Sequence, residues 1–347
     1  MKNLLPLLTL FFFNLNFAQN NQSIINGNWI KFKVEMKDGS KVFDRFMDDS
    51  THFEIVINKD KIRITSDPIQ KNNNDWLSYS LTKDVIKTSE YFGYLIEKVN
   101  QDTLILSEKM NDLTNDKLKR LYLVKSNVLL SKMKDKYKNK VDIIASRTFT
   151  PKLNLYIQSE LSKTFAKNFA NYKLKGSLKI YPKERKIKTE IVFSTTNDST
   201  RIKKIKKIID NSFEKWDIRN FEEYNSVEIP FVLKSEISKN YKGIKIIYLT
   251  DDLDKLEKVI GGKYEDIQKG AEYFEKGINA YLNKNYQKAI DFFSYSYKYD
   301  PKNLEAIYNK AAVYLEIGDK ENACVVWKEI SDLGQMNAKI LIQEHCK

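Results

Sequence analysis

Short runs of alternating apolar and polar residues, separated by polar turns, fill the first third of the chain. The first run spans 28–36, and later runs include 52–57, 62–65, 76–81, 91–98, 103–107 and 120–124. A period of two residues with breaks of two to four polar residues is typical of β-hairpins. The pattern therefore predicts about seven or eight strands between 19 and 125, in a small antiparallel β-barrel or sandwich.

The spacing changes between 151 and 235, where helix and strand patterns alternate. Leu161, Phe165 and Phe169 lie four residues apart, which predicts a helix over 155–169. A hairpin at 176–181 and 187–193, an amphipathic helix over 200–216 and a last strand at 227–233 follow. We expect an α+β domain here, preceded by a partly helical linker at 126–150 and followed by a connector at 236–269.

The remaining residues, 270–347, repeat at an offset of 34. Small residues recur where two helices must approach, as in Gly277 and Ala311, and bulky ones recur where space must be filled, as in Phe293 and Trp327. Such a period is the signature of stacked helical hairpins. We therefore expect an all-α module of two hairpins, with an extra helix at 338–345 covering the last one.

The segment 283–301 resembles the tetratricopeptide repeat (TPR), because Tyr286, Ala289, Phe293 and Pro301 stand at the spacing of that family. The resemblance implies two TPR repeats and a groove that binds a protein or peptide. Its partner-binding residues would be Phe274, Ile278, Tyr281, Tyr308, Asn309 and Leu315. Apolar and aromatic side chains dominate this set, so an apolar peptide is favoured over a clamped carboxylate. Alternatively, Phe274 and Tyr281 pack against the preceding domain.

Two further resemblances concern the other domains. Gly176, Trp216 and the final strand with Pro230 resemble the C-terminal domain of TonB-type proteins, which implies that 227–233 offers a free sheet edge to a partner peptide. The turn at 182–186 lacks the glycine usual in that family. Gly27-Asn28-Trp29 resembles the start of lipocalin-like barrels, which implies that Trp29 closes the barrel floor. The interior would then hold a small apolar ligand, or be filled by side chains.

The N-terminus has the pattern of a secretory signal. Lys2 precedes an apolar run from Leu4 to Phe13, and a small residue, Ala18, follows at the expected distance. About ten apolar residues are too few to span a bilayer. We expect a cleaved signal peptide at 1–18, a secreted or periplasmic protein and no stable membrane insertion, the alternative being a retained anchor.

Composition supports a folded chain with a basic surface. Hydrophobic residues make up 42% and aromatic residues 12%, more than a disordered chain carries, and the formal net charge is +13. A positive surface favours acidic proteins or peripheral contact with anionic surfaces. Because the basic residues are spread along an exported chain, nucleic acid is not an expected partner.

The chain contains two cysteines, Cys324 and Cys346. An even number in a secreted protein favours pairing, with two free thiols as the alternative. Ala323-Cys324-Val325-Val326-Trp327 and the terminal Cys346 are also similar to secreted TPR-like tails, and this similarity implies a disulfide that joins the last helix to the second repeat.

The sequence carries no recognisable motif for catalysis. The two histidines, His52 and His345, fall in separate domains, and the sequence has no metal-ligand spacing, glycine-rich phosphate loop or nucleophile near a histidine. We therefore expect no cofactor, no metal and no enzymatic activity. The expected function is protein binding through the TPR module, and the alternative is carriage of a small apolar ligand in the barrel.

Overall fold

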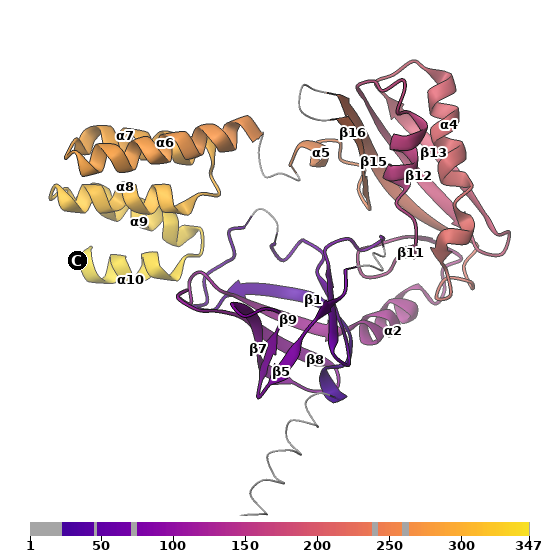
Figure 1. Cartoon of the computed structure of the whole chain (residues 1–347), viewed down its shortest axis with the longest axis horizontal. Coiled ribbons are helices and arrows are strands. Elements are labelled where there is room, and N and C mark those ends of the chain that lie inside the picture. Colours follow the sequence, from indigo (N-terminus) through magenta and orange to yellow (C-terminus); the bar gives the residue numbers. More distant parts are fainter. Residues whose placement is uncertain (1–22, 45–46, 71–74, 238–241, 259–263, 347) are drawn as a thin grey trace, which may run out of the picture.

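A computed structural model describes residues 23–44, 47–70, 75–237, 242–258 and 264–346. A curled antiparallel sheet lies between a mixed sheet with covering helices and a stack of C-terminal helices (Figure 1). The expected signal peptide, 1–18, with its cleavage after Ala18, lies outside the described residues.

The first unit is a nine-stranded antiparallel sheet in the order β4-β3-β2-β1-β9-β8-β7-β6-β5. Its two edge strands, β4 and β5, are separated in sequence by Tyr79 alone, so the sheet curls back on itself into a nearly closed barrel. The antiparallel barrel predicted from the alternating pattern is thereby confirmed. The strands are β1 (Gly27–Met36), β2 (Glu54–Asn58), β3 (Lys61–Thr65), β4 (Leu77–Ser78), β5 (Ser80–Thr82), β6 (Val85–Lys87), β7 (Phe92–Val99), β8 (Thr103–Met110) and β9 (Lys119–Lys125).

Alternating residues of these strands fill the barrel interior. Trp29 is 0% exposed, and its Nε1 donates a hydrogen bond of 2.7 Å to the carbonyl oxygen of Ile25. Ile55, Leu104 and Leu121, from three other strands, are also 0% exposed and belong to the same hydrophobic cluster. The apolar interior is therefore occupied by the chain's own side chains.

A mixed sheet forms the second unit, with β15 at its centre. One side of β15 pairs with β12, and its other side pairs with β10 and then with β16. β13 pairs with β12 at one edge, where α4 packs on it, and α3 packs on β16. The elements are β10 (Asp142–Ile144), α3 (Ile157–Thr164), β12 (Tyr172–Tyr181), β13 (Lys186–Ser194), α4 (Ser199–Asp210), β15 (Ser226–Ile237) and β16 (Lys242–Tyr248).

The expectation that 227–233 is a free edge is wrong. Residues 231–237 of β15 pair with 242–248, a strand that lies in the expected connector, and 226–228 pair in parallel with 142–144 from the expected linker. Pro230 falls between these two partners, where its missing N–H costs no ladder hydrogen bond. Its carbonyl oxygen accepts a hydrogen bond of 2.7 Å from Leu249.

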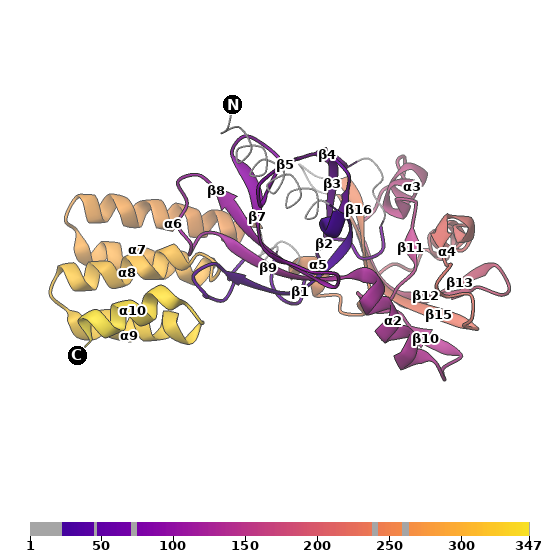
Figure 2. The ribbon, with the colours of Figure 1, turned by 90° about the horizontal axis from the view of Figure 1, so that it is seen from below.

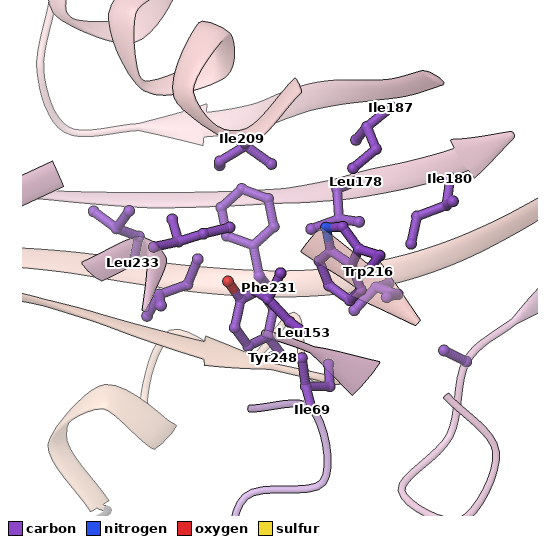
Figure 3. Close-up of a cluster of buried hydrophobic side chains, with 14 of the residues drawn as sticks. Ile69, Leu153, Leu178, Ile180, Ile187, Ile209, Trp216, Phe231, Leu233 and Tyr248 are labelled. Carbon is purple, nitrogen blue, oxygen red and sulfur yellow. The ribbon is translucent and has the colours of Figure 1, made fainter. Parts of the chain in front are cut away.

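The hydrophobic core of this unit draws on segments that are far apart in sequence. Leu178, Phe231 and Tyr248 from the sheet converge with Trp216 and with Ile69, which comes from the barrel side of the chain (Figure 3). Trp216 does not end a helix as expected. α4 stops at Asp210, and Trp216 lies in β14 (Trp216–Asp217), which pairs with β11 (Lys152–Leu153).

The C-terminal region consists of stacked helices (Figure 2). α6 begins before the expected start of the repeats, and Gly277 on it lies so close to α7 that an added Cβ would be 2.6 Å from the Phe293 ring. No helix within the described ranges is long and apolar enough to cross a membrane. The remaining helices are α2 (Ser126–Tyr137), α5 (Lys255–Lys258), α6 (Tyr264–Leu282), α7 (Tyr286–Tyr299), α8 (Leu304–Glu316), α9 (Lys320–Asp332) and α10 (Met336–His345).

Candidate functional site

Four of the six residues expected to bind a partner line one hollow of about 560 Å³. Tyr281 comes from the end of α6, and Tyr308, Asn309 and Leu315 come from one face of α8. Ala312, which also lines the hollow, lies four positions from Tyr308 and three from both Asn309 and Leu315, so these residues share one side of α8. The structure thus brings together side chains from the first helix of each hairpin.

The other two expected residues lie outside this hollow. The Phe274 ring is 5.7 Å from the Phe293 ring, centroid to centroid, and Ile278 packs into the same cluster between α6 and α7. Phe274 therefore packs within its own hairpin. Tyr281, in contrast, is 39% exposed.

The last helix and two barrel loops extend the hollow into a longer groove. A second hollow, of about 580 Å³, shares Tyr308, Asn309 and Leu341 with the first and adds Ile340 from α10. The loop after β1 contributes Ser40 to it, and the loop before β9 contributes Asp116 and Lys117. We call the two hollows together the α8–α10 groove.

Sequence reasoning missed the part of the groove that lies on α10 and the barrel. For Leu341 the signal was present, since the apolar run of the last helix was expected to cover the second hairpin. No pattern connects Ser40 or Lys117 with helices that follow them by more than 180 residues. Only the packing of the barrel against the helical region brings these residues to the groove.

A set of specific contacts fixes the barrel loops against the helices. The Lys41 N–H donates to the Gly334 carbonyl at 3.0 Å, and the Gln335 side-chain amide donates to the Lys41 carbonyl at 2.9 Å. Lys117 forms an ion pair of 2.6 Å with Glu305 at the start of α8. The helical region therefore rests on the barrel, because these loops satisfy polar groups at the starts of α8 and α10.

The groove is acidic although the chain as a whole is basic. Asp116, Glu305 and Glu316 line it, and the cation Lys117 is already paired with Glu305. Burial, together with the nearby carboxylates of Asp38 and Asp116, raises the pKa of Tyr308 to about 12. Tyr308 therefore stays protonated at neutral pH and offers the groove a neutral hydroxyl.

A disulfide between Cys324 and Cys346 confirms the pairing predicted for the two cysteines. It joins α9 to the residue that follows α10, with Cα atoms 5.7 Å apart. Next to it, the Trp327 and His345 rings lie 5.4 Å apart. The C-terminal end of α10, which forms one wall of the α8–α10 groove, is thus covalently fixed to the second hairpin.

The described residues contain no group of three or more His, Cys, Asp or Glu side chains that could hold a metal ion. His52 lies in the barrel unit and His345 at the end of α10. No protein-family model matches this chain, and a comparison with solved structures finds no significant match.

Proposed function

We propose that this protein is a non-enzymatic interaction protein, secreted or periplasmic, that binds a segment of a partner protein in the α8–α10 groove. One observation carries the proposal. Tyr281 from α6 and Tyr308 and Leu315 from α8 line one hollow that continues along α10. Exposed aromatic and aliphatic side chains in a concave surface are the usual anchors of peptide recognition.

The helix spacing supports a TPR assignment for 270–347. α7 begins at Tyr286 and α9 at Lys320, 34 positions later, and the ends of α6 and α8 are the same distance apart. Phe293 and Trp327, one period apart, are both buried at 3% exposure or less. Under this assignment α10 is the cap helix, and the groove is the concave face of the repeats.

The charge of the groove indicates which side chains the bound segment should carry. Three carboxylates and one paired lysine line the groove, so a bound segment with a basic residue beside apolar ones gains favourable electrostatics. The net charge of +13 favours acidic partners for the rest of the surface, and this expectation stays a prediction. Export is compatible with the disulfide, because disulfides persist in oxidising compartments.

The other two units have supporting roles in this proposal. β12, β13, α4 and β15 keep the strand and helix order of a TonB-like domain, but strand addition to β15 is not proposed because both of its sides are paired. Carriage of an apolar ligand in the lipocalin-like barrel gains no support from the interior, which side chains such as Trp29 and Leu121 occupy.

Selection of peptides from a random display library against the full-length protein tests the proposal. Ala312 is exposed and lines the groove, so Ala312→Arg fills the groove without removing a core contact. Ala271, an exposed alanine on α6 outside both linings, provides the matched control Ala271→Arg. We expect selected peptides to be rich in basic and apolar residues and to lose about tenfold or more in affinity for Ala312→Arg only. Equal affinity for the two variants would contradict the proposal.

A further inference from the structure

The outer side of α4 carries only positive charge. Between Asp198, which precedes the helix, and Asp210, which ends it, the sequence contains Arg201 and four lysines but no acidic residue. Three of the lysines are exposed and one, Lys206, is half-buried. We call them the α4 lysine cluster, and its members are Lys203, Lys204, Lys206 and Lys207.

The packing of α4 turns this cluster away from the protein. Ile205 and Ile209 are 0% exposed and belong to the core of the mixed sheet, where α4 packs on β13. Lys203 and Lys207 lie on the opposite side of the helix from Ile205, because residues two positions apart are separated by about 200° around an α-helix. Figure 1 and Figure 2 place α4 at the end of the molecule opposite the C-terminal helices.

The carboxylates at the two ends of α4 interact with groups outside the cluster. Asp198 accepts a hydrogen bond of 2.9 Å from the backbone N–H of Arg201 and pairs with its guanidinium at 3.3 Å. Asp210 accepts a hydrogen bond of 2.7 Å from the backbone N–H of Thr189 on β13. Among the residues that the structure describes, no carboxylate forms an ion pair with a lysine of the cluster.

A helix surface of this kind is destabilised by repulsion between its own charges. Lysines three or four positions apart repel one another, and the cluster contains three such pairs, 203/206, 203/207 and 204/207. Exposed helices usually avoid this repulsion by alternating the sign of charge. On α6, for example, the exposed Glu272 lies three positions after Lys269 and four before Lys276. The uniform charge of α4 therefore favours binding of an external anion over simple solvation.

The side chains of the cluster favour a lipid surface over a protein as that anion. Protein interfaces are usually anchored by aromatic residues and arginines that fill pockets. α4 contains no aromatic residue, and its one arginine, Arg201, is buried. Lysine, in contrast, presents a compact, hydrated charge on a flexible stem. Such charges on the outer side of a helix suit a bilayer, whose many mobile headgroups need no pocket.

We propose that the α4 lysine cluster binds the surface of a bilayer that contains anionic lipids. Each lysine close to such a surface strengthens binding about fivefold, so four lysines give reversible peripheral binding without inserted apolar residues. The α8–α10 groove lies in the C-terminal helices, at the other end of the molecule (Figure 1), so it stays accessible when α4 is on a bilayer.

Co-sedimentation with lipid vesicles tests the proposal. The protein used is the expected mature chain, residues 19–347, because the apolar run at 4–13 would itself bind lipid. At about 50 mM salt, we expect vesicles of phosphatidylcholine with about 30% phosphatidylglycerol to bind the protein at least about tenfold more tightly than phosphatidylcholine alone. Binding should be lost at about 0.5 M salt, since salt screens exposed charges. Equal binding to the two vesicles, or binding to neither, would overturn the proposal.

Two matched double variants locate the contact. Lys203→Gln/Lys207→Gln removes two charges of the cluster, and Lys288→Gln/Lys298→Gln removes two exposed charges of α7. Glutamine keeps helix propensity close to that of lysine. The first variant should bind anionic vesicles about tenfold or more weakly and the second less than about twofold. Its melting temperature should not fall, because the like-charge pair 203/207 is lost. Equal losses in the two variants would assign binding to net charge and overturn a site on α4.

Polyglutamate distinguishes a lipid surface from an acidic protein. It carries carboxylates on a soluble polypeptide, so it imitates an acidic partner without a bilayer. At the same concentration of negative charge, we expect anionic vesicles to bind at least about tenfold more tightly than polyglutamate. If polyglutamate binds as tightly as the vesicles, and Lys203→Gln/Lys207→Gln weakens that binding, the cluster is a site for acidic proteins and the proposal is wrong.

Discussion

The Oγ of Ser40 accepts a hydrogen bond of 2.8 Å from the backbone N–H of Met336, which lies 296 residues further along the chain. Met336 is the first residue of α10, and the first N–H groups of a helix have no partner inside the helix. A serine hydroxyl is a usual cap for such a group. Here the cap comes from the barrel, so the start of the last helix is held by a different unit.

Replacing Ser40 by alanine should loosen α10. The half-buried N–H of Met336 loses its acceptor, which we expect to cost about 1 kcal/mol, the usual value of a lost helix cap. Amide hydrogen exchange over 336–345 should accelerate about fivefold in the full-length protein. Since α10 forms one wall of the α8–α10 groove, peptide affinity should fall as well.

Ser50 provides the control for this substitution. It is an exposed serine in a barrel loop, and its hydroxyl bonds to Asp48 within that loop. Ser50→Ala should leave exchange over 336–345 at the wild-type rate. If Ser40→Ala and Ser50→Ala show the same rate of amide exchange over 336–345, the contact between Ser40 and Met336 does not stabilise α10.

Gly277 should not tolerate a methyl group. In a helix, alanine is favoured over glycine by about 1 kcal/mol. A glycine-to-alanine change at an exposed helix position would therefore stabilise the fold. Here an added Cβ would lie 2.6 Å from a carbon of the Phe293 ring, which is 1% exposed and has little room to move. We expect the overlap to outweigh the helix propensity and to lower the stability of the helical region by about 1–2 kcal/mol.

A double-mutant cycle separates overlap from other causes. Phe293→Leu removes the ring that meets the new methyl group, so Gly277→Ala should cost less in that background than in the wild type. Thermal melting of the four proteins measures the coupling. Additive losses would mean that the ring of Phe293 does not limit the size of residue 277.

The fold could be predicted from sequence where the chain repeats a local pattern. The alternation at 29–36 or 103–107 arises because one face of each strand packs against a core. The offset of 34 relates Gly277 to Ala311 because the two helices of each hairpin must approach closely at these positions. The paired cysteines followed from their number and from the similarity of the tail to known tails. In each case the information lies within one element or one repeat.

The groove and the middle sheet depended on contacts that have no local pattern. The strand 242–248 alternates like the others, but its pairing with β15, together with the pairing of 142–144, is needed to show that 227–233 is not an edge. Similarly, Tyr281 and Leu315 were found from the repeat, whereas Ser40 and Lys117 reach the groove through packing between units. Register and docking between distant segments are decided by the whole core.

The disulfide should stabilise the C-terminal helices chiefly by restricting their unfolded state. Cys324 and Cys346 are 22 positions apart, and closing a loop of this length contributes about 3 kcal/mol. Cys346→Ser should therefore lower the melting temperature of the helical region and leave hydrogen exchange in β12 and β15 unchanged. Thiol labelling of the denatured, unreduced wild type checks the premise. Two reactive thiols per chain would show that the bridge is absent from the purified protein.

Glu54 should make the protein sensitive to acid. Burial alone would raise the pKa of this carboxyl. The His52 imidazole, whose Nε2 lies 3.5 Å from the Oε2 of Glu54, and the ammonium of Lys152, which lies 2.9 Å from the same oxygen, outweigh burial and hold the pKa at about 2. Since the unfolded chain takes up the proton near pH 4.5, stability is complete above that pH and is lost as pH falls toward 2. Between pH 6 and pH 3 the stability lost from this group is about 2 kcal/mol.

Urea unfolding at several pH values measures this loss. The free energy of unfolding should decline less steeply with falling pH for Glu54→Gln than for the wild type, although the variant is less stable at pH 6. Parallel declines would assign the acid sensitivity to other carboxyls.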